Sequence, residues 1–189
     1  YIGTELCKLY SGVSWLHNIT VIDNRFISER VNQLRNWNME FVQGDILDKN
    51  LIKKYCSEAD VVHHLAGVTE VPRTKIDASK EKDEKIKEIG VKGTQNILDS
   101  INNKCKIIFP STHVVYEGIN EVRKNIKEDE ATKPVLSYSS SKAVNEDQLK
   151  KSGKNYIILR LGSVYGYSYD SMRIDIMPNL FSKIASQNG

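Results

Sequence analysis

Five short apolar runs rich in β-branched residues recur along the chain, and amphipathic segments separate most of them. Parallel strands need long crossover connections, usually helices, so this alternation is typical of βαβ units around a buried parallel sheet. The sequence therefore predicts an α/β fold with a doubly wound parallel sheet. The predicted strands are Ile19–Ile22, Met39–Val42, Val61–Leu65, Lys106–Phe109 and Tyr156–Leu161.

The clearest helical pattern covers Asp83–Ile101, where apolar residues recur every three or four positions. Gly90 and Gly93 on this stripe predict a close approach to a neighbouring element. The polar stretch Gly118–Pro134 has no period and predicts a long surface loop, a kind of segment that is often functional. Shorter helices are expected at Thr4–Tyr10, at Lys49–Cys56 after an Asp48 cap, at Tyr138–Lys150 and at Asp175–Ser186.

Composition and charge exclude several classes of function. The 189 residues carry a net charge of +3, and lysines are mixed with acidic residues, which indicates a solvated surface and no nucleic-acid partner. The longest apolar stretches fall short of the ~20 residues of a membrane span. Three cysteines without C-x-x-C spacing predict neither a disulfide framework nor a metal site, so we expect a reducing, cytoplasmic location.

Two residues near the start match what a dinucleotide-binding fold requires. Gly3 precedes a helical pattern, and Asp23 closes a predicted strand about 20 residues later, where an acid can accept the ribose hydroxyls of NAD. A single glycine before a helix is also explained by packing alone. Asp23 would repel a 2′-phosphate and predicts NAD over NADP, although Arg25 could pair with that phosphate.

Two further strand ends carry small or acidic residues, namely Gly44-Asp45-Ile46 and His64-Leu65-Ala66-Gly67. Ligands of open α/β sheets lie beyond the carboxyl ends of strands, so these segments could border an adenine and a pyrophosphate. Turn geometry and tight packing explain them as well. His63 and His64 point to opposite faces of a strand, so we expect a structural histidine and no metal site there.

The strongest group of residues is Tyr138 and Lys142 at the start of a predicted helix, preceded by Ser111-Thr112 at a strand end. Residues four apart stand on one helix face, and a nearby ammonium lowers the pKa of a phenol by stabilising the phenolate. The Thr112 hydroxyl can bind the same substrate oxygen. Together the three predict a proton relay to a carbinol whose hydride passes to nicotinamide.

Seven motifs in order make the chain resemble the extended short-chain dehydrogenases/reductases, the sugar-nucleotide epimerases and dehydratases typified by UDP-glucose 4-epimerase. The motifs are Tyr1-Ile2-Gly3, Val21-Ile22-Asp23-Asn24, Gly44-Asp45-Ile46, His64-Leu65-Ala66-Gly67, Ser111-Thr112 through Tyr116, the Tyr138/Lys142 pair, and Leu159-Arg160-Leu161 with Val164-Tyr165-Gly166. The resemblance implies a Rossmann-like fold with NAD as cofactor.

The resemblance also implies residue roles. Thr112 takes the place of the catalytic Ser/Thr, Tyr138 that of the acid/base, and Lys142 that of the ribose-binding lysine. The implied cofactor-binding residues are Ile2, Gly3, Asp23, Asn24, Asp45, Ile46, Leu65, Ala66, Gly67, Ser111, Tyr138 and Lys142.

Some positions depart from the family pattern. Gly90 and Ser163 stand where the family usually has Asn, and Tyr167 stands in place of Pro. In the 4,6-dehydratases Asp-Glu follows the catalytic Thr, whereas His113-Val114 follows Thr112 here. Dehydration of that kind is therefore disfavoured.

These patterns lead to one expectation and two alternatives. We expect residues 1–189 to be the NAD-binding Rossmann domain of a sugar-nucleotide epimerase, with a substrate-binding part starting at about residue 164. The first strand and most of the substrate domain are expected to be missing, so that the fragment alone is inactive. The expected partners are a nucleotide-sugar and, at full length, a second copy in a homodimer. A reductase of the same family and a non-catalytic NAD(P) sensor remain as alternatives.

Overall fold

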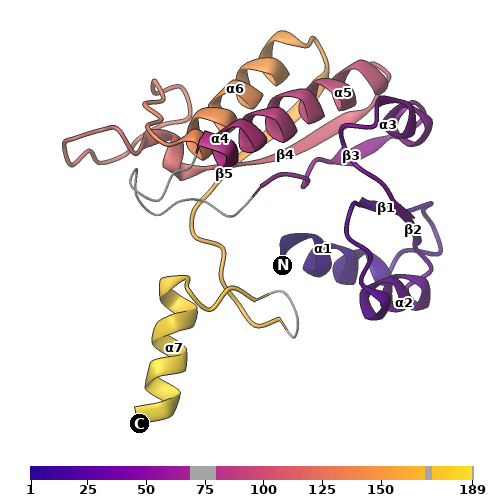
Figure 1. Cartoon of the computed structure of the whole chain (residues 1–189), viewed down its shortest axis with the longest axis horizontal. Coiled ribbons are helices and arrows are strands. Elements are labelled where there is room, and N and C mark those ends of the chain that lie inside the picture. The colour runs from indigo at the N-terminus through magenta and orange to yellow at the C-terminus, as the bar shows by residue number, and fades with distance from the viewer. Residues whose placement is uncertain (69–79, 169–171, 189) are drawn as a thin grey trace. The chain divides into compact units, whose positions relative to one another are not determined.

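The computed structural model describes residues 1–68, 80–168 and 172–188, which divide into two compact units. One unit comprises Tyr1–Val21, Ile27–Phe41 and Leu161–Gly189, and the other comprises Ile22–Phe26 and Val42–Arg160. Figure 1 traces the chain from the N-terminus to the C-terminus.

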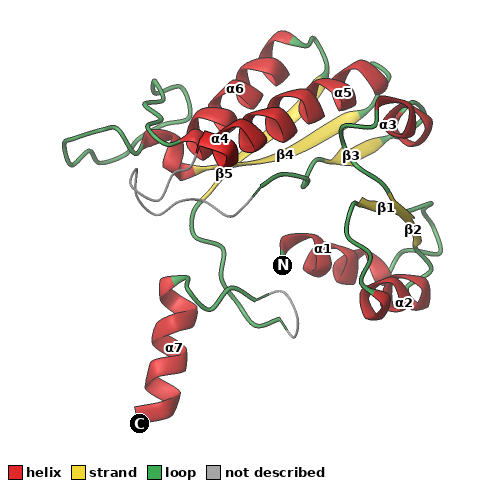
Figure 2. Cartoon of the chain, viewed as in Figure 1, coloured by secondary structure: helices red, strands yellow, loops and turns green. Residues whose placement is uncertain are grey.

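The larger unit is built on a three-stranded sheet in the order β3-β4-β5. The strands are β3 (Val61–His63), β4 (Lys106–Thr112) and β5 (Asn155–Leu161). β3 and β4 are parallel, as the sequence predicted, and Val61 lies opposite Lys106. The helices of this unit are α3 (Lys49–Cys56), α4 (Lys80–Lys87), α5 (Gly93–Ser100) and α6 (Ser137–Lys151), and α4, α5 and α6 lie along one face of the sheet (Figure 2).

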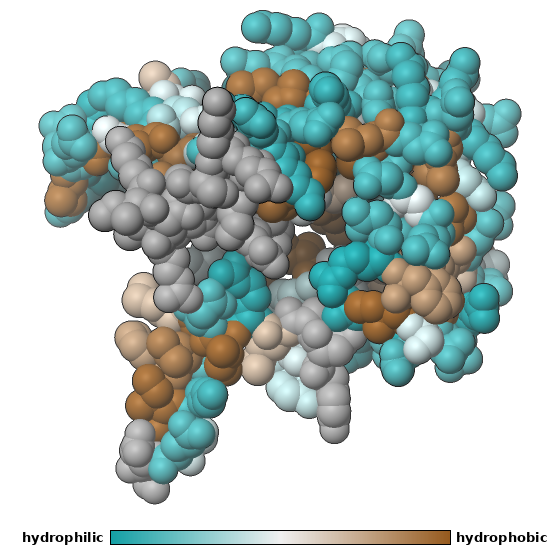
Figure 3. All heavy atoms as spheres, in the orientation of Figure 1, coloured by the Kyte–Doolittle hydropathy of each residue, from teal (hydrophilic) through white to brown (hydrophobic). Residues whose placement is uncertain are grey.

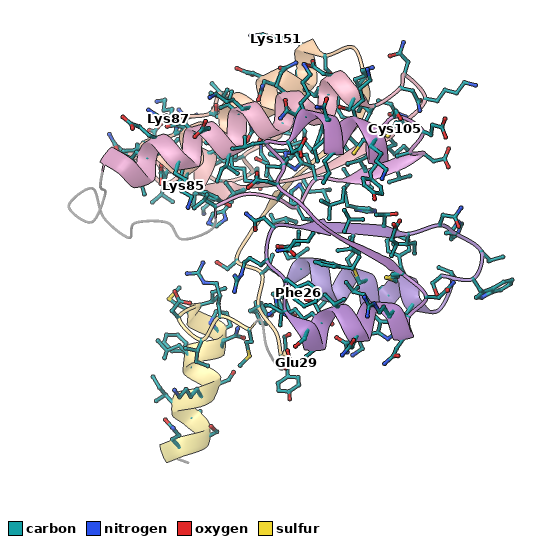
Figure 4. All side chains as sticks on the ribbon, turned by 45° about the vertical axis from the view of Figure 1, so that its right-hand side comes forward. Phe26, Glu29, Lys85, Lys87, Cys105 and Lys151 are labelled. Carbon is teal, nitrogen blue, oxygen red and sulfur yellow. The ribbon has the colours of Figure 1, made fainter. Side chains whose placement is uncertain are left out.

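The core lies between this face of the sheet and the helices. Ile107 and Phe109 alternate along β4 and are fully buried, together with Leu149 of α6. The core also includes Cys105, which lies just before β4 and is labelled in Figure 4. Lys85 and Lys87 on α4 and Lys151 on α6, labelled in the same figure, are exposed. Inward residues at every second strand position are what a pleated strand with one covered face requires.

Helix α3 begins and ends where the sequence predicted. The carboxylate of Asp48 accepts hydrogen bonds from the N–H groups of Asn50 and Leu51, both at 3.0 Å, and so satisfies two donors of the first turn. Ile52 and Cys56, four residues apart on one face, are buried in the core.

The long helix predicted over Asp83–Ile101 is present, with a difference in its middle. A π-helical turn, η2 (Glu88–Lys92), joins α4 to α5. The predicted close approach is confirmed: a Cβ at Gly90 would lie 2.3 Å from Ser141 Oγ, and one at Gly93 would lie 2.9 Å from Ile46 Cγ2. The widened turn suits this contact, because the Asn145 amide donates to the Gly90 carbonyl at 3.0 Å.

A second sheet has two strands, β1 (Thr20–Asp23) and β2 (Glu40–Gln43). The two strands are parallel. The N–H of Glu40 donates to the Ile19 carbonyl and, four residues later on both strands, the N–H of Gly44 donates to the Asp23 carbonyl. Among the described strands, β1 is paired only with β2, and β3 only with β4.

The remaining helices are α1 (Ile2–Ser11), α2 (Ser28–Asn36) and α7 (Met177–Asn188). No helix in the described ranges combines the length and the hydropathy that a membrane crossing needs. Helix α7 exposes Met177, Phe181 and Ile184, and Figure 3 shows apolar side chains gathered along it.

Several elements differ from the sequence prediction. Helix α2 was missed, because its nine residues are mostly polar and bury only Val31 and Leu34. Strand β3 ends at His63, whose carbonyl accepts a hydrogen bond from the Leu65 N–H at 3.0 Å. Strand β4 continues beyond Phe109 to Thr112 and leads into the 3₁₀ helix η3 (His113–Tyr116). The predicted loop over Gly118–Pro134 contains neither helix nor strand.

Candidate active site

Tyr138 and Lys142 stand one turn apart at the start of α6, which places them on one face of the helix. The Lys142 ammonium donates to the carbonyl of Pro110 at 2.8 Å. Pro110 lies in β4, two residues before Thr112. The structure thus brings the first turns of α6 to the end of β4, as the sequence predicted.

The Lys142 side chain is largely withdrawn from solvent. Its Nζ lies 4.3 Å from the centroid of the Phe109 ring, a distance at which a cation is attracted by the aromatic face. Burial lowers the pKa of Lys142 to about 8. The side chain is therefore still mostly protonated at neutral pH and can stabilise a phenolate next to it.

Thr112 connects β4 to η3. It is buried, and its Oγ1 accepts a hydrogen bond from the Val114 N–H at 3.3 Å, which caps the 3₁₀ helix. The hydroxyl hydrogen can still be donated to a substrate oxygen. This cap holds the hydroxyl at the end of the strand.

A buried network, missed by the sequence prediction, locks α6 against the sheet. The Glu146 carboxylate accepts from Ser111 Oγ at 2.6 Å and from Arg160 Nη2 at 2.6 Å. Burial would raise the pKa of Glu146, but the bonds from Arg160 and Ser111 lower it overall, so the group is ionised. Two signals could have revealed this pair: Glu146 lies one turn after Lys142, and Arg160 is the one charged residue within the apolar run Tyr156–Leu161.

The hydroxyl of Ser111, which the sequence prediction assigned to the cofactor, thus donates to Glu146. Its role toward NAD stays a prediction. Arg160 also donates to the Tyr116 hydroxyl and to the Glu128 carbonyl, which ties η3 and the loop after it to β5.

The ends of β1 and β2 lie side by side, which places Asp23 near Asp45. The Asn24 amide donates to Asp45 Oδ2 at 3.4 Å, and the Gly44 N–H donates to the Asp23 carbonyl at 3.0 Å. Asp23 is exposed, and its Oδ1 accepts from the Arg25 backbone N–H at 2.9 Å. A carboxylate held in this way at a strand end is able to accept ribose hydroxyls.

The segment after β3 is exposed at two small residues. These are Ala66 and Gly67, and a Cβ placed on Gly67 would meet no atom of the described residues within 4 Å. Ile46 is buried under Gly93 and serves as packing in the structure. Ile2 and Gly3 open α1 in the smaller unit, where their predicted role toward the cofactor stays a prediction.

His64 is buried directly beneath this segment. Its Nε2 lies 2.8 Å from Thr94 Oγ1, and its ring centroid lies 5.3 Å from that of Phe109. Burial, with a smaller contribution from the Lys142 charge, lowers the pKa of His64 to about 3. The residue is therefore a neutral interior histidine, in line with the structural role that the sequence predicted.

Comparisons with known proteins place the chain in a family. Residues 1–188 match the model of the NAD dependent epimerase/dehydratase family. A UDP-N-acetyl-alpha-D-glucosaminuronate decarboxylase of Bacillus cytotoxicus is 33% identical over 118 residues, covering 61% of this chain and 35% of the relative. A CDP-paratose 2-epimerase of Salmonella typhi is 32% identical over 158 residues, covering 68% of this chain and 44% of the relative.

The fold also has solved counterparts. A UDP-glucuronic acid 4-epimerase of Bacillus cereus superimposes with a TM-score of 0.78 at 23% identity, covering 99% of this chain and 60% of that one. The chain spans 35% and 44% of the two curated relatives. It belongs to the NAD dependent epimerase/dehydratase family, whose cofactor is NAD, and has the Rossmann-like α/β fold of that family's solved structures.

Proposed function

We propose that the protein containing this chain is an NAD-dependent nucleotide-sugar epimerase that acts by transient oxidation of a sugar carbinol. The observation that carries the proposal is the Tyr138/Lys142 pair, anchored by the 2.8 Å bond from Lys142 to Pro110 beside Thr112. The family and the epimerase among its relatives support the same reaction class.

The residues at the strand ends fit the cofactor. Asp23 presents an exposed carboxylate, and the exposed small residues Ala66 and Gly67 suit a group that approaches the backbone. We assign the adenosine ribose to Asp23 and the pyrophosphate side to Ala66-Gly67, an arrangement that favours NAD over NADP. NAD, when bound, supplies the acceptor and the later donor of the hydride.

The chain itself moves the proton. The Tyr138 phenolate takes the proton of the carbinol O–H as the C–H bond breaks, which leaves a keto-sugar and a neutral phenol. Lys142 stabilises the phenolate, and the Thr112 hydroxyl donates to the same sugar oxygen. When the carbinol is restored with the opposite configuration, Tyr138 returns the proton.

Substitution in the whole protein tests these roles. Tyr138→Phe removes the proton acceptor and keeps the ring, so turnover should fall by at least ~10²–10⁴-fold with little change in NAD affinity. Lys142→Ala should lower both turnover and NAD affinity. Thr112→Val should reduce turnover less than Tyr138→Phe or Lys142→Ala does. Tyr156→Phe, an exposed tyrosine on β5, is the matched control and should keep wild-type rates.

The measurements are initial rates and NAD binding for the four variants. Near-normal turnover of Tyr138→Phe would contradict the assignment and favour a non-catalytic NAD(P) sensor. Product analysis separates the remaining alternative, since a reductase releases product after one hydride transfer and consumes the reduced cofactor stoichiometrically.

A further inference from the structure

Helix α6 begins without a capping side chain of its own. Leu136 occupies the N-cap position, where an aliphatic side chain offers no acceptor. The acceptor comes instead from Glu117, nineteen residues earlier in the chain. Its Oε1 accepts from the backbone N–H groups of Val135 and Leu136, both at 2.7 Å, and from the hydroxyl of Ser139.

Glu117 lies directly after η3, the short helix whose N-cap is Thr112. It is the C-cap of η3, and its N–H donates to the Val114 carbonyl at 3.1 Å. One residue therefore joins the element that carries Thr112 to the turn that carries Tyr138. Two backbone bonds, Gly118 N to Lys133 O and Lys133 N to Val115 O, both 2.8 Å, close the same junction.

The charge of Glu117 suits this place. Partial burial would raise the pKa of its carboxyl, but the bonds from Ser139, Leu136 and Val135 together lower it, so the group is an anion at neutral pH. An anion at a helix N-terminus is favoured by the helix dipole. The carboxylate thus binds the N-cap N–H of α6 and is favoured there by the helix dipole.

We propose that Glu117 is a positioning residue for the reaction, which holds the first turn of α6 so that Tyr138 stands at the required place relative to Thr112. The inference rests on the proposed function. The reason is geometric: Ser139 is the immediate neighbour of Tyr138, and a displacement of about 1 Å at a reacting group can cost about 10²-fold in rate.

The test compares Glu117→Ala with Glu117→Gln in the whole protein. Alanine removes the acceptor, so kcat should fall about 10- to 100-fold, whereas KM for the sugar-nucleotide and the Kd for NAD should change less than about threefold. Glutamine keeps an acceptor oxygen on the same stem and should restore most of kcat. The control Glu121→Ala removes an exposed acid of the following loop and should keep wild-type kinetics.

A second measurement follows the helix start directly. Amide hydrogen exchange of residues 135–140 should speed up at least about tenfold in Glu117→Ala and stay near the wild-type rate in Glu117→Gln, while exchange in α3 is unchanged. A kcat for Glu117→Ala within threefold of wild type would overturn the inference. So would a glutamine variant as impaired as the alanine variant.

The two proposals fail separately. If Tyr138→Phe is inactive and Glu117→Ala is not impaired, only the positioning role of Glu117 is lost. If Tyr138→Phe keeps its turnover, the proposed function is lost whatever Glu117→Ala shows.

Discussion

Lys142 and His64 show how burial sets the charge of single residues around the candidate site. Both are bases withdrawn from water, and burial lowers both pKa values, to about 8 for Lys142 and about 3 for His64. At neutral pH the two groups therefore differ in charge, with a cation at Lys142 and a neutral ring at His64. A neutral His64 leaves Lys142 as the cation that faces Phe109.

The lowered pKa of His64 predicts a loss of stability in acid. Its pKa is about 3 in the folded chain and 6.5 as the ordinary value, so between these pH values the unfolded chain binds the extra proton. The contribution of neutral His64 to the free energy of unfolding is fully present above pH 6.5. That free energy should fall by roughly 2–5 kcal/mol as pH approaches 3. Chemical denaturation of the whole protein at a series of pH values measures this slope.

Two substitutions isolate the contribution of His64. The His64→Asn variant lacks the titrating ring, so its stability should decline less steeply between pH 6.5 and pH 4 than that of the wild type. The His17→Asn variant removes an exposed histidine and should keep the wild-type slope. Equal slopes for His64→Asn and wild type would contradict a His64 pKa well below 6.5.

Residues that act through near neighbours in the sequence were predictable, and those that act across the fold were not. The Asp48 cap and the Tyr138/Lys142 face follow from spacings of two to four residues. Glu146 binds Ser111 and Glu117 binds Leu136, over 35 and 19 residues. Such pairings depend on tertiary contacts that no local period reveals.

At the level of elements, two glycines on one helical segment should respond to substitution in opposite ways. A Cβ at Gly93 would lie 2.9–3.1 Å from three carbons of Ile46, which is itself buried and has little room to move. Gly93→Ala should therefore destabilise the protein by about 1–3 kcal/mol, in spite of the better helix propensity of alanine.

A Cβ at Gly90 would instead clash with Ser141 Oγ, at 2.3 Å. This hydroxyl can move away by rotation about the single Cα–Cβ bond of Ser141. Gly90→Ala should thus be near neutral, or stabilising by up to ~1 kcal/mol from helix propensity. Thermal and urea unfolding of the two variants measure the difference. A Gly93→Ala variant as stable as Gly90→Ala would show that the contact with Ile46 yields easily.

Elements with a strong apolar periodicity were predicted, whereas helix α2, which has a weak one, was missed. Helix α3 has a cap and a clear apolar face, so its bounds followed from the sequence. Helix α2 buries only two side chains within nine residues, which leaves no apolar stripe to detect. The π-helical turn was also beyond prediction, because no local pattern indicates it; within it, Gly90 accepts a hydrogen bond from Asn145 of α6.

At the scale of the whole chain, the described sheet β3-β4-β5 has one covered and one open face. Ile158 and Val62 pack against the core, whereas their neighbours Ile157 and Val61 are exposed. The sequence predicted a buried sheet because its strands are nearly continuous apolar runs, the pattern of strands covered on both faces. Apolar composition alone does not reveal which face a given chain covers.

The open face predicts how residues 1–189 behave when produced alone. Ile157 and Leu159 lie two positions apart on β5 and are 40% and 41% exposed, so they form a contiguous apolar surface that should bind a hydrophobic dye and promote aggregation. Replacing both by Lys should reduce the fluorescence of 8-anilinonaphthalene-1-sulfonate at least twofold and raise the soluble yield. Val122→Lys is the control, since Val122 is 95% exposed and lies on the loop after η3 instead of on β5, and it should change neither quantity. Equal dye binding by the wild-type chain and the double variant would show that this face is not the surface responsible.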